Sequence, residues 1–240
     1  MTAPRFYVAP DEASIAADME MSLPASVTRH ALQVLRLRTG DAVVLFDGRG
    51  GEYPATLAVS GRQAHARVGS HSAVERETAV PITLVQGLVA ADVMDDIVRK
   101  AVELGAHAIV PVLAERSQRA PAERLDRRVV RWRQIAVSAC EQCGRNRVPA
   151  IEAVIPLRTW IAGRRPLQDV AVLDPRAPQP LAALAARSRG LLIGPEGGLT
   201  DDEVALATSA GAVAVHLGAR TLRADTAAIA ALGVAVSLAG

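Results

Sequence analysis

The chain has 240 residues, half of them hydrophobic and 22% charged, and a formal net charge of +2 at pH 7. This is the composition of a globular protein that can bury a core; it excludes intrinsic disorder, and two cysteines are too few for a disulfide framework. No charge-free apolar run reaches the roughly 18 residues of a membrane span and the first ten residues lack a secretory pattern, so we expect a soluble, cytoplasmic protein that does not enter membranes.

The first 72 residues are predicted to form a small β-rich domain. Strand-like segments are joined by tight turns, among which Asp47-Gly48 is typical of a hairpin. Helical apolar spacing follows Pro24, a residue that suits the start of a helix. Several short strands of this kind favour a small barrel. The expected strands cover residues 5–9, 42–46, 52–59 and 64–69, and the expected helix covers residues 25–36.

A polar segment without periodicity, residues 70–80, is the expected linker to a larger domain over residues 73–240. That domain alternates strands and helices, and its near-continuous apolar strands indicate a buried parallel sheet in an α/β fold. Ligands of such sheets bind beyond the carboxyl ends of the strands. The expected strands are 82–89, 108–113, 169–174, 190–194 and 212–217; the expected helices are 92–104, 123–142, 180–187, one from near residue 200, and 224–238.

Charge is distributed unevenly along the chain. Residues 99–165 hold 14 basic and 6 acidic groups, a net charge of +8, whereas the segments before and after are net acidic. Four arginines of this segment recur at helical spacing: Arg124, Arg127, Arg128 and Arg131. They indicate either a solvated helix face or a surface that binds phosphate, and the charge pattern alone leaves both interpretations open.

Two glycine-containing segments each follow an expected strand and open a helix. In Gly194–Thr200 the glycines permit close backbone approach to a ligand, and Thr200 with Glu203 predicts a capping box. This segment is neither a phosphate-binding P-loop nor a dinucleotide fingerprint, and by itself it is also compatible with an ordinary tight turn. In Leu217–Ala227 two arginines lie three residues apart before a helix start that Asp225 or Thr226 can cap.

The segment Glu141–Pro149 ends the long basic helix, and Gly144 suits its C-cap. Cys140 and Cys143 lie near this helix end without a second cysteine pair, so zinc binding together with His107 or His216 is disfavoured. We expect both cysteines to pack within the helix.

The chain resembles the RsmE family of 16S ribosomal RNA uridine N3-methyltransferases, which belong to the SPOUT superfamily. Four motifs in the larger domain carry the resemblance, in chain order RKAVELGAHAIVPVLAERS, EQCGR, GPEGGLTDDE and LGARTLRADTAA. The first domain is similar to that family's PUA-like domain. The matching motifs are RFYV near the N-terminus, His30 followed by VLRLRTGD, and FDGRG. The resemblance covers almost the whole chain. One departure is Asp225, which stands where the family usually has Glu.

The resemblance implies a PUA-like RNA-binding β-barrel domain over residues 1–72 and a trefoil-knotted SPOUT methyltransferase domain over 73–240. It implies methylation of uridine N3 (uridine 1498 of the decoding region), a 16S rRNA or 30S subunit partner, a homodimer that completes the site, and no metal. It also implies S-adenosyl-L-methionine, bound by loops 194–199 and 217–223 and a third near Leu173–Arg176. The implied cofactor residues are Leu173, Ile193, Gly194, Pro195, Glu196, Gly197, Gly198, Leu217, Gly218, Leu222, Arg223, Thr226 and Ala227.

Uridine N3 carries a proton, so the reaction benefits from a general base or from arginines that stabilise the uracil anion. The candidate catalytic residues are Glu141, Arg145, Glu196 and Arg223, with Asp174 and Asp225 as further possible bases. The candidate RNA-binding residues are Arg5, His30, Arg36, Arg38, Arg116, Arg145 and Arg147. Two alternatives remain: a related SPOUT enzyme with a different target position, and a non-catalytic RNA-binding factor in ribosome assembly.

Overall fold

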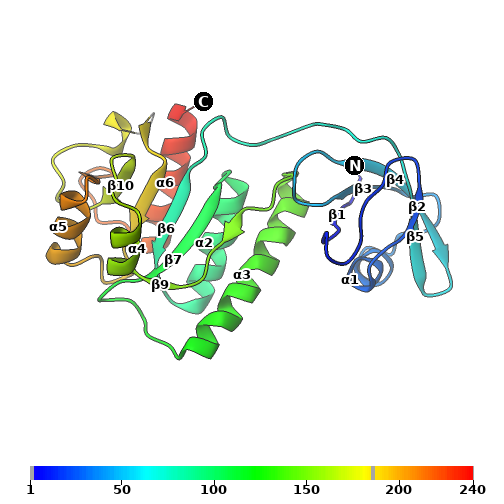
Figure 1. Cartoon of the computed structure of the whole chain (residues 1–240), viewed down its shortest axis with the longest axis horizontal. Coiled ribbons are helices and arrows are strands. Elements are labelled where there is room, and N and C mark those ends of the chain that lie inside the picture. Colours follow the sequence, from blue (N-terminus) through cyan, green and yellow to red (C-terminus); the bar gives the residue numbers. More distant parts are fainter. Residues whose placement is uncertain (1–2, 185–186, 240) are drawn as a thin grey trace. The chain divides into compact units, whose positions relative to one another are not determined.

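A computed structural model describes residues 3–184 and 187–239 of the chain (Figure 1). The chain divides into two compact units: unit 1 comprises 1–77 and 140–148, and unit 2 comprises 78–139 and 149–240. The boundary after residue 77 lies within the polar segment expected to be the linker. Unit 1 also includes 140–148, which the sequence assigned to the larger domain.

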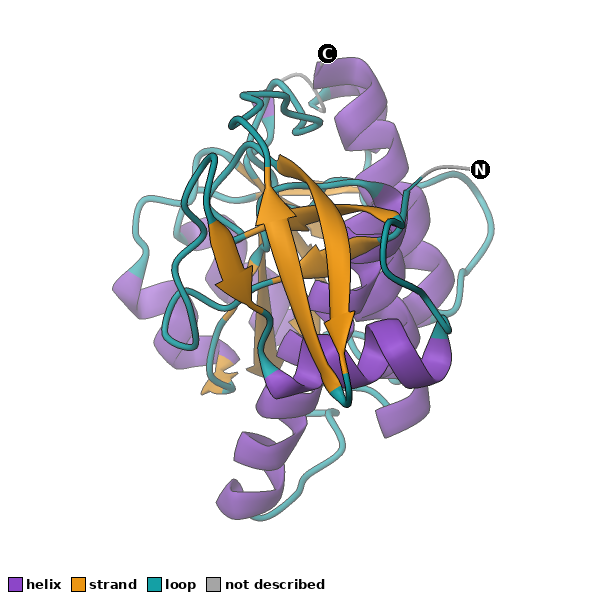
Figure 2. Cartoon of the chain, turned by 90° about the vertical axis from the view of Figure 1, so that its right-hand side faces the viewer, coloured by secondary structure: helices purple, strands orange, loops and turns teal. Residues whose placement is uncertain are grey.

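Unit 1 contains a five-stranded sheet in the order β1-β3-β4-β5-β2. Only the pair β1–β3 is parallel, and the other neighbours are antiparallel; Figure 2 shows β4 and β5 as the two long arrows nearest the viewer. The four expected strands are present, and a fifth, β2, was not predicted because three residues are too few to establish a period. The strands are β1 (Arg5–Tyr7), β2 (Glu20–Ser22), β3 (Ala42–Phe46), β4 (Tyr53–Ser60) and β5 (Gln63–Val68).

The expected helix of unit 1 has two parts. An α-helical stretch, α1 (Ala25–Arg29), continues into π-helical turns, η1 (His30–Val34), and the segment ends where Arg36 takes a positive φ of 56°. Its apolar side packs on the sheet through Val27 and Ala31, and these residues share one buried cluster with Phe6 and Leu57. The helical periodicity therefore identified the buried face only at Val27 and Ala31, because Val34 and Leu35, at the π-helical end, are 65% and 42% exposed.

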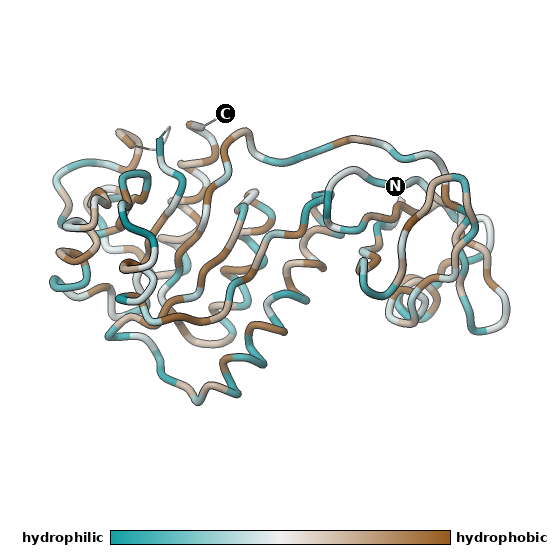
Figure 3. The backbone as a smooth tube through the Cα atoms, viewed as in Figure 1, coloured by the Kyte–Doolittle hydropathy of each residue, from teal (hydrophilic) through white to brown (hydrophobic). Residues whose placement is uncertain are grey.

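Unit 2 contains a sheet in the order β12-β10-β11-β6-β7-β8, with β9 also paired to β7. Every pair is parallel, as the repeated βα pattern predicted. Central strands β6 and β7 are buried along their length and are largely brown in the hydropathy colouring of Figure 3. The strands are β6 (Thr83–Gly87), β7 (Ala108–Leu113), β8 (Ala150–Ile151), β9 (Ile155–Pro156), β10 (Val170–Leu173), β11 (Gly190–Ile193) and β12 (Val213–Val215).

Helices cover both faces of this sheet. On one face, α4 and α5 pack through Trp160, Ile161 and Ala207 onto strand residues such as Val85 and Val172. On the other face, α6 contacts β6 and β11 and packs against α2. The helices are α2 (Ala91–Glu103), α3 (Ala122–Cys143), α4 (Leu157–Gly163), α5 (Asp201–Ser209) and α6 (Ala224–Ala239).

One expectation for unit 2 was wrong, and three short elements were not predicted. The helix predicted over 180–187 is a single 3-10 turn, η2 (Leu181–Ala183), within the described residues, and residues 185–186 lie outside them. Pro180, its N-cap residue, offers no side-chain hydrogen bond to the first turn, and 3-10 geometry is typically confined to such short pieces. The short elements β8, β9 and α4 carry too few residues to show a period and were not predicted. Among residues 3–184 and 187–239, no helix is long and apolar enough to cross a membrane.

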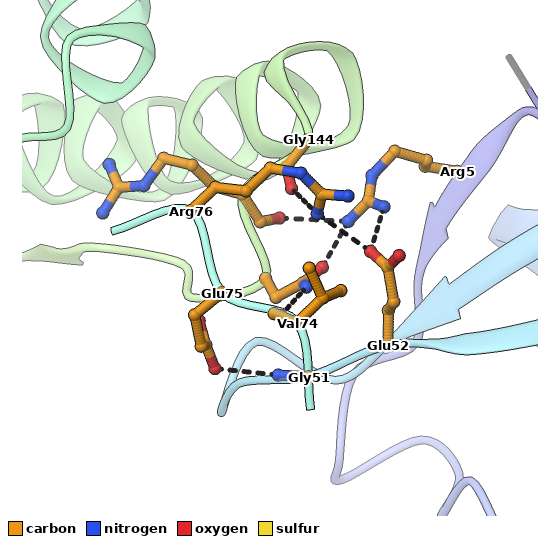
Figure 4. Close-up of polar contacts among 9 residues, drawn as sticks. Arg5, Gly51, Glu52, Val74, Glu75, Arg76 and Gly144 are labelled. Atoms are coloured by element: carbon orange, nitrogen blue, oxygen red, sulfur yellow. Dashed lines mark hydrogen bonds and ion pairs between the residues drawn. The ribbon is translucent and has the colours of Figure 1, made fainter. Parts of the chain in front are cut away.

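An ion-pair network within unit 1 explains why residues 140–148 belong to it (Figure 4). Arg145 is 3% exposed, and its Nε and Nη2 donate to the two carboxylate oxygens of Glu77 at 3.0 and 2.5 Å. Arg76 donates to the Gly144 carbonyl at 2.9 Å and to Glu52 at 3.1 Å. The end of α3 is thus hydrogen-bonded to the polar segment 70–80.

Arg5 extends this network to the first strand of unit 1. Its guanidinium donates to Glu52 at 2.6 Å, to the Arg145 carbonyl at 3.3 Å and to the Asn146 side chain. Burial opposes ionisation of Glu52, but hydrogen bonds from Arg76 and Arg5 hold its pKa below the ordinary value. The stabilisation by Glu52 is therefore present above its unfolded-state pKa and is lost as the pH falls through the lower folded-state pKa.

Replacing Arg145 by Met is expected to lower the free energy of unfolding by about 3 kcal/mol, because the largely buried Glu77 carboxylate loses its partner. Replacing Glu77 by Gln in the same protein should restore part of this loss. The control is Arg147→Ala, which removes an exposed ion pair to Glu75 at 3.4 Å and should cost less than about 1 kcal/mol. Urea unfolding followed by circular dichroism measures all three; equal effects of R145M and R147A would contradict the prediction.

Candidate functional site

A cavity of about 420 Å³ lies in unit 2 at the carboxyl ends of β10, β11 and β12. Three loops line it: the one after β10, the one after β11 and the one after β12. Because these strands are parallel neighbours in the sheet, their carboxyl ends meet at one edge. The cavity therefore forms where the sequence placed the ligand loops.

Eleven of the thirteen cofactor-binding residues expected from the sequence line this cavity, whereas Arg223 and Thr226 do not. Among the catalytic candidates, Glu196 lines it, and so does Asp174; Asp225 does not. Five further lining residues belong to the three loops expected to bind the cofactor, although they were not named individually: Pro175, Arg176, Leu199, Arg220 and Thr221. The sequence reasoning missed lining residues outside those loops, on β12 or directly after it and at the starts of the helices that follow. These are Asp201, Val204, Val215, His216 and Ala224.

The loop after β11 has a compact geometry that requires glycine. A Cβ on Gly194 would lie 2.8 Å from the Leu199 nitrogen and 2.9 Å from the Gly198 carbonyl carbon, and Gly198 has a φ of 71°. The same loop packs directly on the end of β6, where a Cβ on Gly87 would lie 2.7 Å from the Pro195 nitrogen. Real Cβ atoms do not tolerate such separations, so a side chain at residue 87 or 194 would displace the cavity wall.

Contacts from three other segments hold this loop. Gln86 on β6 donates its side-chain amide to the Gly194 carbonyl at 3.3 Å, and Arg116 donates to the Gly197 carbonyl at 2.9 Å. The Glu196 carboxylate accepts the backbone N–H of Ala90, the N-cap residue of α2, at 2.8 Å. Ala90 has no side-chain cap of its own, so Glu196 caps α2 from a distant part of the chain.

The capping box predicted at the start of α5 is confirmed. The Thr200 hydroxyl accepts the Glu203 N–H at 3.3 Å, and the Glu203 carboxylate accepts the Thr200 N–H at 3.0 Å. The other carboxylate oxygen of Glu203 accepts the Glu115 N–H at 2.8 Å. Glu203 thus joins α5 to the loop after β7, the loop that also carries Arg116.

An ion-pair cluster, in which Arg176 and Asp201 are exposed and Asp174 is largely buried, lines the cavity. Arg176 donates to Asp174 at 3.1 Å within its own loop and to Asp201 at 2.6 Å on the first turn of α5. Burial tends to raise the pKa of Asp174, but hydrogen bonds from Arg176 hold it below the ordinary value. Asp174 is therefore ionised and engaged near neutral pH. Asp225 lies on the first turn of α6, where its carboxylate accepts the Thr226 hydroxyl at 3.5 Å.

The remaining catalytic candidates, Glu141 and Arg145, belong to unit 1. Glu141 accepts the backbone N–H of Tyr7 at 3.0 Å, and burial raises the pKa of its carboxyl group. Arg145 is paired with Glu77 as described above. Burial also raises the pKa of the neighbouring Cys140 thiol to about 12, so the thiol stays protonated.

The expected RNA-binding residues fall into two groups. Arg36, Arg38, Arg116 and Arg147 are exposed and His30 is half-buried, whereas Arg5 and Arg145 are largely buried in the ion-pair network. His30 stacks edge-on against Phe6 with ring centroids 5.6 Å apart. Among the described residues, no group of three or more His, Cys, Asp or Glu side chains is arranged to hold a metal ion.

Comparisons with known proteins match both units. A family model described as an RNA methyltransferase domain matches residues 76–236, and one described as an RNA methyltransferase PUA domain matches residues 23–68. The chain is 36% identical to ribosomal RNA small subunit methyltransferase E of Mycobacterium bovis, covering 85% of this chain and 81% of that protein. It is 29% identical to the Bacillus subtilis protein of the same name, covering 95% and 94%.

Two solved structures are also similar over nearly the whole chain. One is ribosomal RNA small subunit methyltransferase E of Neisseria gonorrhoeae bound to S-adenosyl methionine, with a TM-score of 0.88, 35% identity and coverage of 96% and 95%. The other is a Legionella pneumophila protein solved with the cofactor SAM, with a TM-score of 0.91, 29% identity and coverage of 99% and 98%.

Replacing Gly87 by Ala is expected to lower the free energy of unfolding by about 1–3 kcal/mol, since the new methyl group overlaps Pro195. Hydrogen exchange of the amides in residues 194–199 should become faster. The control is Gly163→Ala in α4, where a Cβ meets nothing within 4 Å, so stability should stay equal or rise slightly. Thermal unfolding and hydrogen exchange measure both variants, and indistinguishable results for the two would show that Gly87 does not determine the loop position.

Proposed function

We propose that this chain, which belongs to the ribosomal RNA small subunit methyltransferase E family, transfers a methyl group from S-adenosyl-L-methionine to uridine N3 of 16S rRNA, at the decoding-region uridine 1498. The observation that carries the proposal is the single cavity onto which eleven of the thirteen expected cofactor residues converge. Membership of the rRNA methyltransferase family limits the reaction to methyl transfer onto ribosomal RNA, and the cavity can accommodate the methyl donor S-adenosyl-L-methionine.

The cavity suits the proposed cofactor in size and chemistry. Its volume lies within the range of small-molecule sites. Leu173, Ile193 and Leu222 offer an apolar wall for an adenine ring, and the glycines of the loop after β11 allow backbone groups to approach the ligand. When bound, S-adenosylmethionine supplies an electrophilic methyl group on a cationic sulfonium.

The chain's own residues position the reactants and handle charge. Methyl transfer requires an in-line approach of the uridine nitrogen, so a fixed cofactor loop contributes to the rate. Arg220 lines the cavity, and its side chain makes no hydrogen bond or ion pair with any residue of the described ranges, so it can face the uracil anion. Arg223 follows in the same motif outside the cavity lining, and Glu196 anchors the loop.

Unit 1 contributes RNA binding in this proposal. It matches an RNA methyltransferase PUA domain and presents Arg36 and Arg38 to solvent beside the end of η1. The proposed substrate is 16S rRNA within the small ribosomal subunit, and the proposed location is the cytoplasm. The family resemblance also supports a homodimer and a trefoil knot in unit 2.

The test is mass spectrometry of 16S nucleosides after small subunits lacking the modification are incubated with the protein and S-adenosyl-L-methionine. We expect 3-methyluridine at uridine 1498. Another methylated nucleoside would favour a related enzyme with a different target. A protein that neither binds the cofactor in calorimetry nor forms a methylated product would favour a non-catalytic assembly factor.

The contacts of Glu196 predict that it is a positioning residue and not the general base. Glu196→Gln keeps an oxygen acceptor for the Ala90 N–H and should keep kcat/KM within about 3-fold of wild type. Glu196→Ala loses that contact and should lower kcat/KM about 10-fold, mainly through a raised KM for the cofactor. Steady-state kinetics distinguish the roles, because loss of a base would lower kcat by 100-fold or more in both variants.

A further inference from the structure

A second cavity of about 410 Å³ lies in unit 2 beside the cofactor cavity. It is lined by Leu113, Ala114, Glu115, Arg119, Ala120, Pro156, Arg158 and Glu203. These residues come from the loop after β7, from the junction of β9 and α4, and from the first turn of α5. No motif of the sequence indicated it, because its two arginines lie 39 positions apart (119 and 158) in separate segments.

The two cavities share their dividing wall. The loop after β7 places Arg116 on the cofactor cavity and Arg119 on the second one. The first turns of α5 likewise place Val204 on the cofactor cavity and Glu203 on the second one. Since the Arg116–Gly197 and Glu203–Glu115 hydrogen bonds hold this wall together, a group bound in the second cavity lies next to the cofactor.

The charged groups that remain accessible in the second cavity are mainly cationic. Arg119 and Arg158 are exposed, and neither side chain makes a hydrogen bond or ion pair within residues 3–184 and 187–239. Glu203 is 2% exposed, and its two carboxylate oxygens accept backbone N–H groups. Glu115 alone presents an accessible carboxylate, which leaves a net positive charge toward a ligand.

We propose that this second cavity binds a backbone phosphate of the RNA strand that carries the target uridine, with Arg119 and Arg158 as its ligands. Two guanidinium groups present planar pairs of donors that match phosphate oxygens. With the cofactor in the first cavity, the strand around the target nucleotide lies on neighbouring surface, and the second cavity, which carries Arg119 and Arg158, adjoins the first. The inference rests on the proposed function, since it takes RNA as the substrate.

The experiment compares wild type, the double variant Arg119→Ala/Arg158→Ala, and the control double variant Arg165→Ala/Arg187→Ala. The control removes the same charge from two exposed arginines of unit 2 that line neither cavity. Binding to a fluorescein-labelled 16S rRNA transcript is measured by anisotropy at several salt concentrations, without S-adenosyl-L-methionine. Calorimetry gives the affinity for S-adenosyl-L-methionine, and thermal unfolding checks folding.

We expect the Arg119/Arg158 variant to bind the transcript about 10- to 30-fold more weakly at 0.1 M salt, with a log–log salt slope smaller by about 0.7 to 1.5. The control should stay within about 3-fold of wild type, and cofactor affinity should be unchanged in both. Equal RNA affinities for the two double variants would overturn the inference. A matching loss of cofactor affinity in R119A/R158A would also overturn it, because the arginines would then support the cofactor loop.

The RNA-binding experiment tests this inference independently of the proposed methyl transfer. RNA binding is measured without methyl transfer, whereas the proposed function depends on the nucleoside that wild-type protein produces. If the wild-type protein forms no 3-methyluridine, the proposed function is wrong. The comparison of variants would still decide whether Arg119 and Arg158 bind the RNA backbone.

Discussion

The close packing of Gly194-Pro195 against the end of β6 is the contact on which the candidate site depends. It is possible only because Gly87 has no side chain, since a Cβ there would lie 2.7 Å from the Pro195 nitrogen. Once seated, the loop is held by Gln86, Glu196 and Arg116 through hydrogen bonds to three separate segments. A loop held in this way presents its backbone to a ligand in one conformation, which is the preorganisation that binding and group transfer require.

The same wall separates two cavities of unit 2 that have similar volumes. Glu203 is central to this arrangement, because one carboxylate caps α5 and also holds the loop after β7. Both carboxylate oxygens of Glu203 accept backbone N–H groups, so Glu203 lines the second cavity without strongly repelling a bound anion. The loop after β7 can therefore direct Arg116 to one side and Arg119 to the other.

The basic segment 99–165 does not act as one surface. Arg145 is buried against Glu77, Arg131 donates to Asp95 at 2.6 Å, and Arg133 donates to the Ile151 carbonyl. All three hold other parts of the chain, but only Arg145 is buried, and the Arg131 side chain is 66% exposed. The net charge of +8 thus combines arginines engaged in contacts within the chain with arginines such as Arg119 and Arg158, which make no such contact among the described residues, and only the three-dimensional structure separates the two kinds.

Residue patterns along the chain were enough to predict the parallel α/β sheet, the capping box at Thr200 and the loops that line the cofactor cavity, because periodicity, caps and glycine turns are local properties of the chain. They could not assign Glu196 to the start of α2, Arg145 to Glu77 or Arg158 to the side of Arg119. Each of those contacts joins segments tens of residues apart, and a carboxylate or guanidinium has the same local pattern whether it caps a helix, fills an ion pair or faces a ligand. Only the tertiary structure, which decides which buried charges find partners and which remain open to solvent, separates these roles.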